Sequence, residues 1–224
     1  MAHFKNDFLQ FFMELAANNN KDWFDENRKR YENFVKKPFA DFVTHLIAEV
    51  AKTDQRYKDL TASECIFRIN RDIRFSKDKT PYKLFSSAVI SPNGRKSDSV
   101  HGIYFELTPE AVRVYGGIYE IDKERLMILR EGIAENLEAF KKIISAKEFV
   151  DTFGELHGDK NKVLPAELKD AAAKQPLIFN KQFYVLTEFP ASLITSENLT
   201  STLMHCYKTI APLEQFFNQF IERK

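Results

Sequence analysis

The spacing of apolar residues changes twice along this 224-residue chain, and the order of the changes limits what the chain can fold into. In the first third, apolar residues recur every three or four positions, which is the helical period. The middle third has short β-branched and aromatic runs separated by turn residues, and helical spacing returns afterwards. This order predicts an α+β fold with a mainly antiparallel central sheet, packed by N-terminal, middle and C-terminal helices.

Three helices are expected in the first third of the chain. The first ends at the asparagines of residues 18–20, and Asp22 is expected to cap the second. Pro38 should break or kink that second helix, because proline lacks an N–H and its ring clashes with the preceding turn. A third helix then runs to about Lys52. The inward faces of these helices are rich in phenylalanine, which predicts a Phe-rich core.

Strands are expected in the middle third. Two of them are joined by a hairpin turn at 108–110, which favours an antiparallel meander. A helix is expected after them from about Asp122 to Phe140, and Pro212 is expected to begin the closing helix. The predicted strands are residues 65–70, 87–90, 101–107, 112–115 and, in the last third, 183–188.

Charge and cysteine content exclude several classes of protein. The chain has 33 Lys and Arg against 32 Asp and Glu, a net charge of +1, so any basic site must be local. Cys65 and Cys206 lack metal-binding spacing and are expected to be free, buried thiols in a reducing compartment. No signal peptide and no membrane-spanning apolar run is visible. We therefore expect a single domain, residues 1–224, in the cytoplasm, with no metal, no cofactor and no membrane partner.

Residues 67–75, Phe-Arg-Ile-Asn-Arg-Asp-Ile-Arg-Phe, alternate with period two. The apolar side chains then share one strand face and polar side chains share the other. Residues 68–83 carry six basic side chains and two aspartates, a local charge of +4. Because guanidinium groups bind carboxylate or phosphate in a planar, two-pronged way, this segment is a candidate anion site. Its candidate residues are Arg68, Asn70, Arg71, Asp72, Arg74, Lys77, Lys79 and Tyr82.

The residues that follow the candidate strand are typical of a helix start. Thr80 resembles an N-cap and Pro81 a first helical residue, and a helix begun there would aim free N–H groups at an anion. The alternative is an exposed strand face whose arginines and lysines pair with Asp72 and Asp78. The sequence alone leaves both interpretations open.

A second cluster of polar and aromatic residues begins at the asparagines 18–20. It contains Trp23, the only tryptophan of the chain, and Arg28, and both are candidate ligand contacts. The plainer interpretation is a capped helix whose tryptophan anchors the core. Arg130 lies among apolar neighbours on its predicted helix, where an ion pair at the edge of the core is the plainer interpretation. Gly116-Gly117 permits a close backbone approach to a ligand, or a tight turn.

Three motifs occur in order along the chain. They are Asn19-(3)-Trp23-Phe24-(3)-Arg28-(2)-Tyr31, the run FRINRDIRFSKDKTPYK at 67–83, and Gly116-Gly117-Ile118-Tyr119 ahead of Leu129-Arg130. Together they resemble a widespread family catalogued as domain of unknown function 2461. The likeness covers about Phe4 to Phe140 and implies that the three motifs belong to one design, but it implies no reaction.

The last third departs from that family. The family carries a Pro-Lys-Gly-aromatic stretch and an Asp-His-Pro, whereas this chain has Leu-Pro-Ala-Glu-Leu at 164–168 and no Asp-His-Pro. The resemblance therefore implies that any part of a site formed by this segment is altered here.

These observations leave three functions open. The favoured one is binding, with or without catalysis, of an anionic small molecule at the basic segment. The alternative is a protein-interaction or scaffold domain in which the charged motif is a structural ion-pair network. A nucleic-acid partner is least favoured, because binding of a phosphate backbone needs a broad basic face. A concave site that holds Trp23, Arg68 and Arg74 would favour the first function, and internally paired charges would favour the second.

Overall fold

The computed structural model describes residues 2–96 and 102–221. The chain divides into two compact units. The first comprises residues 1–97, 104–114 and 188–204, and the second comprises residues 98–103, 115–187 and 205–224. The expectation of one cooperative domain stays a prediction.

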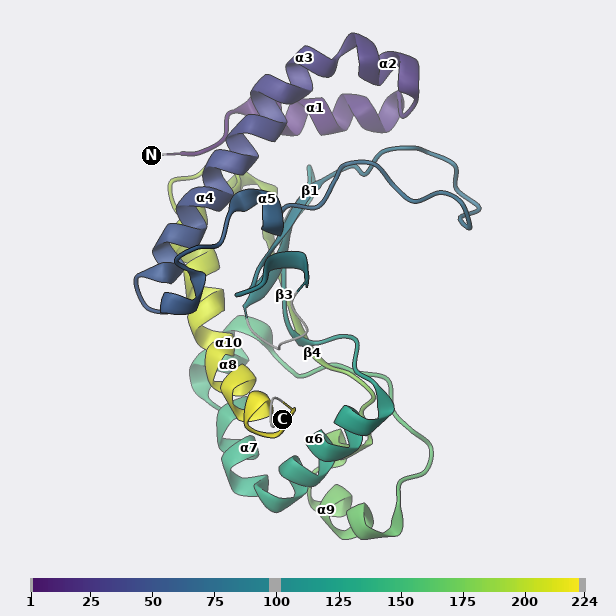
Figure 1. Cartoon of the computed structure of the whole chain (residues 1–224), viewed down its shortest axis with the longest axis vertical. Coiled ribbons are helices and arrows are strands. Elements are labelled where there is room, and N and C mark those ends of the chain that lie inside the picture. Colours follow the sequence, from purple (N-terminus) through teal and green to yellow (C-terminus); the bar gives the residue numbers. More distant parts are fainter. Residues whose placement is uncertain (1, 97–101, 222–224) are drawn as a thin grey trace. The chain divides into compact units, whose positions relative to one another are not determined.

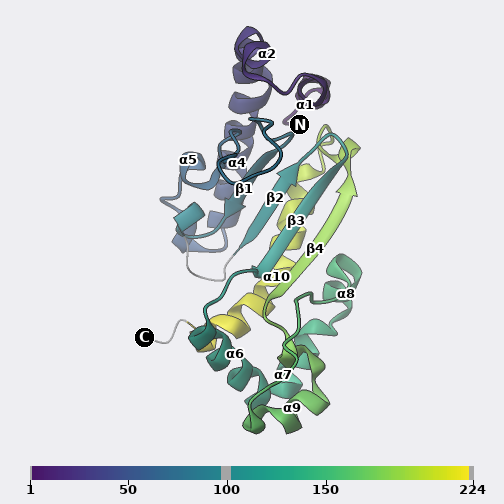
Figure 2. The same cartoon turned by 90° about the vertical axis from the view of Figure 1, so that its right-hand side faces the viewer.

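Four strands lie side by side in the order β1-β2-β3-β4 and form an antiparallel sheet (Figure 2). The predicted turn between β2 and β3 is confirmed: the Thr108 N–H donates to the Ala111 carbonyl at 3.0 Å, and the Thr108 hydroxyl accepts from the Ala111 N–H at 2.9 Å. With the helices around the sheet, this confirms the α+β fold. The strands are β1 (Ser86–Ile90), β2 (Ile103–Leu107), β3 (Ala111–Ile118) and β4 (Phe183–Pro190).

Most of the predicted strands agree with the structure to within a few residues. The strand predicted at 65–70 is wrong, because helix α5 (Ala62–Cys65) ends there and an irregular extended segment follows. His101, where the strand 101–107 was predicted to begin, lies outside the described residues.

Helix α2 of the first unit begins where a side chain satisfies a free N–H group. The expected cap of the second helix is wrong by two residues: the Asn20 side chain accepts from the Trp23 N–H at 3.0 Å, and Asp22 lies inside the first turn. Asn20 caps the helix, and the negative charge of Asp22 in the first turn interacts favourably with the positive end of the helix dipole. These helices are α1 (Asn6–Ala17), α2 (Lys21–Glu26), α3 (Arg28–Tyr31) and α4 (Lys37–Ala51).

Pro38 does not break the helix, which was one of the two expected outcomes, but the helix is irregular just before it. A π-helical turn, Glu32–Lys36, joins α3 to α4, and the Lys37 N–H donates to the Glu32 carbonyl, five residues back. Pro38 follows at the first turn of α4, where its missing N–H is tolerated. The wide turn separates the proline ring from the preceding carbonyls, so that the helix continues.

Phenylalanine rings fill the core of the first unit, as the composition predicts. Phe8 and Phe12 of α1 are fully buried, with ring centroids 5.3 Å apart. Phe39 and Phe42 of α4 lie 5.9 Å and 6.0 Å from the Phe105 ring of β2. Helix α4 is thereby held against one face of the sheet by aromatic contacts.

The second unit contains most of the remaining helices. The predicted helix from Asp122 to Phe140 is two helices, since Asn136 ends the first and its side chain donates to the Gly132 carbonyl at 2.9 Å. Pro212 lies inside the last helix and does not begin it. It occupies an exposed position between buried neighbours, so packing keeps the helix intact around it. The helices are α6 (Lys123–Glu135), α7 (Leu137–Ile144), α8 (Lys147–Phe153), α9 (Lys169–Lys174) and, from residue 205 on, α10 (Leu199–Ile221).

Aromatic contacts also form the core of the second unit. The Phe217 ring of α10 lies 5.7 Å from Phe183 of β4 and 6.3 Å from Phe140 of α7. Both cysteines are free and buried, one in each unit. Among the described residues no helix is long and apolar enough to cross a membrane.

Candidate functional site

The basic segment lies on an extended arm, residues 66–88, which Figure 1 shows as the long blue hairpin between α5 and β1. Its two legs meet at two isolated antiparallel bridges, Ile66 with Ala88 and Asn70 with Tyr82. Three residues separate the bridges on one leg and five on the other. This unequal spacing prevents a regular ladder, so the predicted strand with one shared polar face does not form. The predicted helix at Thr80 is also absent from the described structure.

A side-chain clasp holds the arm to the N-terminal helices. The Asn19 amide donates to the Tyr82 carbonyl at 2.9 Å, and its oxygen accepts from the Tyr82 N–H at 3.1 Å. Asn19 thus pairs with Tyr82 as a neighbouring strand would. The Tyr82 ring stacks on Phe24 at 4.1 Å between centroids. Two of the three sequence motifs meet at this clasp, and Tyr82 is part of its packing.

Trp23 and Arg28 flank this clasp and do not reach the basic part of the arm. The Trp23 ring packs 5.6 Å from Phe11. The Arg28 guanidinium lies 5.5 Å from the Phe24 ring and pairs with Asp25 at 2.5 Å. Both contacts fit a capped helix with an aromatic anchor.

Local pairs neutralise much of the charge at the tip of the arm, residues 72–79. Arg74 donates to Asp72 through Nε at 3.0 Å and Nη2 at 2.7 Å. Asp78 accepts from the Thr80 N–H at 2.9 Å and from Arg71, and these bonds lower the pKa of Asp78 to about 2. The tip is therefore an ordered loop, and these pairs are those expected of a structural charge network.

The other basic residues of the arm are arranged differently. Lys79 donates to the Ile73 carbonyl at 2.9 Å, while Arg68, Asn70 and Lys77 are exposed. Within the described residues, no carboxylate lies within ion-pair distance of Arg68, although its charge, after the bonds from Arg74, helps to lower the pKa of Asp72. The basic residues predicted for the site therefore lie along the arm as separate ion pairs and single cations.

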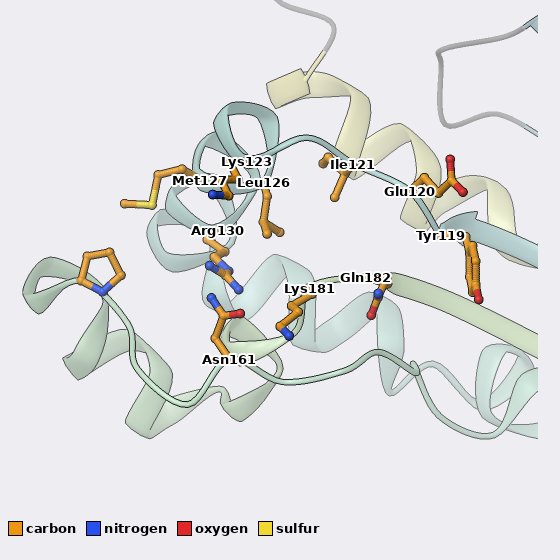
Figure 3. A pocket seen from close by; sticks show the side chains of 11 residues that line it. Tyr119, Glu120, Ile121, Lys123, Leu126, Met127, Arg130, Asn161, Lys181 and Gln182 are labelled. Carbon is orange, nitrogen blue, oxygen red and sulfur yellow. The ribbon is translucent and has the colours of Figure 1, made fainter.

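The second unit contains a pocket of about 630 Å³ that the sequence did not predict (Figure 3). This volume is typical of small-molecule sites. The pocket lies between α6, the loop before α9 and the start of β4. Its lining residues are Tyr119, Glu120, Ile121, Lys123, Leu126, Met127, Arg130, Asn161, Pro165, Lys181 and Gln182.

Backbone pairing brings the two sides of this pocket together. The segment 157–161 runs beside 179–184, with the Asn161 N–H donating to the Phe179 carbonyl at 2.8 Å and the Lys181 N–H to the Asp159 carbonyl at 2.7 Å. Asp122 caps α6 by accepting from the Arg125 N–H at 2.9 Å, which fixes where that helix begins. Three segments distant in sequence thus converge on one pocket.

Arg130 is the unusual residue of the pocket. Its side chain is 4% exposed, and its Nη2 donates to the carbonyls of Asn180 at 2.8 Å and Phe179 at 3.3 Å. With the Asn161 amide oxygen turned toward it, Nη1 and Nη2 gain further bonds of 3.3 Å and 3.2 Å. Figure 3 shows Arg130 and Asn161 pointing toward each other, with Lys181 beside them.

All of these partners are neutral. Among the described residues no carboxylate pairs with Arg130, so the expected ion pair at the core edge is not found there. The Nε atom is buried and has no hydrogen-bond partner. Burial lowers the pKa of Arg130, because the charged form is desolvated. A buried guanidinium held only by carbonyl and amide dipoles can accept an anion as its countercharge.

The sequence offered one signal for this pocket, namely an arginine among apolar neighbours in the third motif. It offered none for Asn161 or Lys181, which reach Arg130 only through the pairing of 157–161 with 179–184. Gly117 has a φ of 84°, and a side chain there would collide with the Phe183 carbonyl, so this glycine permits a tight strand contact and not the approach of a ligand. In residues 2–96 and 102–221 no group of His, Cys, Asp or Glu is placed to hold a metal ion.

The family model described as "Conserved hypothetical protein (DUF2461)" matches residues 7–216. The chain belongs to this family. No curated protein and no solved structure matches it. Membership in the DUF2461 family assigns no reaction, and the match includes all the residues that line the pocket of the second unit.

Proposed function

We propose that this DUF2461 protein binds an anionic small molecule in the pocket of the second unit. The observation that carries the proposal is Arg130, a residue 4% exposed that borders a pocket of about 630 Å³ and has no carboxylate partner among the described residues. Arginine is rarely buried unless it is paired, because removing its charge from water costs several kcal/mol. An anion in the pocket would supply the missing countercharge.

The surroundings of Arg130 support the same ligand class. Lys123 and Lys181 also line the pocket, and Glu120 is the acidic residue among its lining. Both lysines are exposed, so they contribute to attraction at long range more than to binding energy. Arg130 offers the planar, directional contact that carboxylates and phosphates prefer.

Ligand-dependent thermal unfolding tests the proposal. Inorganic phosphate, sulfate and citrate are titrated at constant ionic strength, and at least one should raise Tm with concentration, as linkage requires. The double variant Lys123→Gln, Lys181→Gln should weaken this response, because it removes the attraction that both lysines exert on the anion. Lys174→Gln, which removes an exposed lysine of α9 outside the pocket lining, is the matched control. An unchanged response in the double variant would contradict the proposal.

The anion site predicted on the arm stays a separate and weaker proposal. Asp72 and Asp78 pair with Arg74 and Arg71, so two of the six basic residues at 68–83 are already neutralised. Arg68 is the residue whose removal tests it. If Arg68→Gln abolishes the phosphate response and the pocket variants do not, the ligand binds on the arm.

A second candidate function is a protein-interaction module, and Phe75 favours it. This side chain is 95% exposed on the tip of the arm, and the Arg74 guanidinium lies 5.8 Å from its ring. Aromatic and arginine side chains are common anchors of protein interfaces. A photo-reactive amino acid in place of Lys77 should give one discrete adduct in cells, and Phe75→Ser should remove it. An adduct pattern that Phe75→Ser leaves unchanged would refute this role.

A further inference from the structure

The lining of the Arg130 pocket is divided between charge and apolar surface. Arg130, Lys123 and Lys181 supply positive charge, and Glu120 subtracts one, which leaves the lining with a charge of +2. Leu126 and Met127 of α6 are half-buried and belong to the same lining (Figure 3).

A bare inorganic anion would contact only the charged part of such a lining. It would contact the cations and leave the apolar side chains in water, because phosphate or sulfate has no surface to bury against them. A ligand with an apolar body gains free energy in proportion to the apolar area that it covers. The volume of about 630 Å³ is also far larger than an inorganic anion needs.

From this division of the lining we infer that the ligand is an organic dianion. Its head group carries two negative charges and is a phosphate monoester or a dicarboxylate. The head group is attached to an apolar body. The head lies at Arg130 and Lys181, where it balances the charge of +2. The body lies against Leu126, Met127 and Pro165. This inference rests on the proposed function, since it assumes that the Arg130 pocket is the binding site.

Defined probes separate the contributions of charge and apolar contact. Calorimetric titration of the full chain compares 1-naphthyl phosphate, naphthalene-2,3-dicarboxylate, inorganic phosphate and the neutral 1-naphthol. One of the two naphthyl dianions should bind at least tenfold more tightly than inorganic phosphate, a difference of about 1.4 kcal/mol. Whichever dianion binds more tightly identifies the head group. The neutral naphthol should show no binding.

Two neighbouring side chains of α6 provide a matched pair of variants. Met127→Gln keeps the length and helix propensity of the side chain but makes the wall polar, so it should weaken binding of the naphthyl dianion at least threefold. The same variant should change the affinity for inorganic phosphate by less than twofold. Ile128→Gln changes an exposed residue outside the pocket lining and should alter neither affinity.

The outcomes distinguish this inference from the proposed function. If inorganic phosphate binds and neither dianion binds more tightly, the apolar wall has no role, and the inference fails while the proposed function stands. If no anion binds, both fail. If the neutral naphthol binds as tightly as the dianions, the pocket is an apolar site, and both fail again. Equal weakening by Met127→Gln and Ile128→Gln would mean that the helix itself was perturbed, and it would overturn the placement of the body.

Discussion

Replacing Asn19 by Ala should detach the arm from the N-terminal helices. The change removes both hydrogen bonds to the Tyr82 backbone, at 2.9 Å and 3.1 Å. A typical hydrogen bond contributes about 1 kcal/mol net, so we expect the loss of two to cost about 2 kcal/mol. For a protein of this size that lowers Tm by about 4–8 °C.

Chemical denaturation followed by circular dichroism measures the loss, and hydrogen exchange locates it. Exchange should accelerate at Arg71 and Lys83, whose N–H groups donate to carbonyls across the arm. Asn18→Ala is the control, since the Asn18 side chain bonds only within α1, to the Glu14 carbonyl at 2.9 Å. It should cost well under 1 kcal/mol. Equal destabilisation by both variants, or unchanged exchange in the arm, would refute the clasp.

Further tests concern the buried thiols, two glycines, the tip of the arm and the cooperativity of unfolding. Cys65 and Cys206, whose pKa burial raises to about 12, should not react with a thiol reagent in the native protein at pH 8, and both should react in denaturant. Gly117→Ala should cost at least about 2 kcal/mol by denaturation, whereas Gly154→Ala, with φ of 72° but open space around it, should cost about 1 kcal/mol. Below pH 3 the tip of the arm should loosen as Asp78 protonates. The pKa of Asp78 is depressed to about 2, so the stabilisation that its carboxylate provides is lost as pH falls through that value. Faster hydrogen exchange at the Thr80 N–H would report this loss. Scanning calorimetry should show one transition if the chain is a single cooperative domain, and two separable transitions would contradict that prediction.

Much of the fold could be predicted from residue periodicity alone. The α+β class, the first helix and the turn at Thr108 follow from local patterns, because each depends on residues close in sequence. The strand predicted at 65–70 failed since alternation specifies a strand only where a partner ladder exists, and the arm has two unequal legs. Pro212 failed for a related reason: packing held the helix together through a position where local propensity favours an end.

The candidate sites were predicted less well than the fold. Charge counting found the arm but not its internal pairing, because which aspartate binds which arginine depends on the path of the backbone. Arg130 was visible as an arginine on an apolar helix, yet its neutral partners come from Phe179 and Asn180, some fifty residues later. Nothing in a single sequence places those carbonyls beside it.

The number of residues in the π-helical turn Glu32–Lys36 sets the orientation of the helices before it. It holds one residue more than an α-helical turn, and deleting any one of its five residues would let α3 and α4 join as an ordinary helix. Each residue of an α-helix turns the chain by about 100°. The deletion would therefore keep the helix but rotate α1, α2 and α3 around its axis, carrying Asn19 away from Tyr82. Length variation among related chains should thus not be tolerated at residues 32–36.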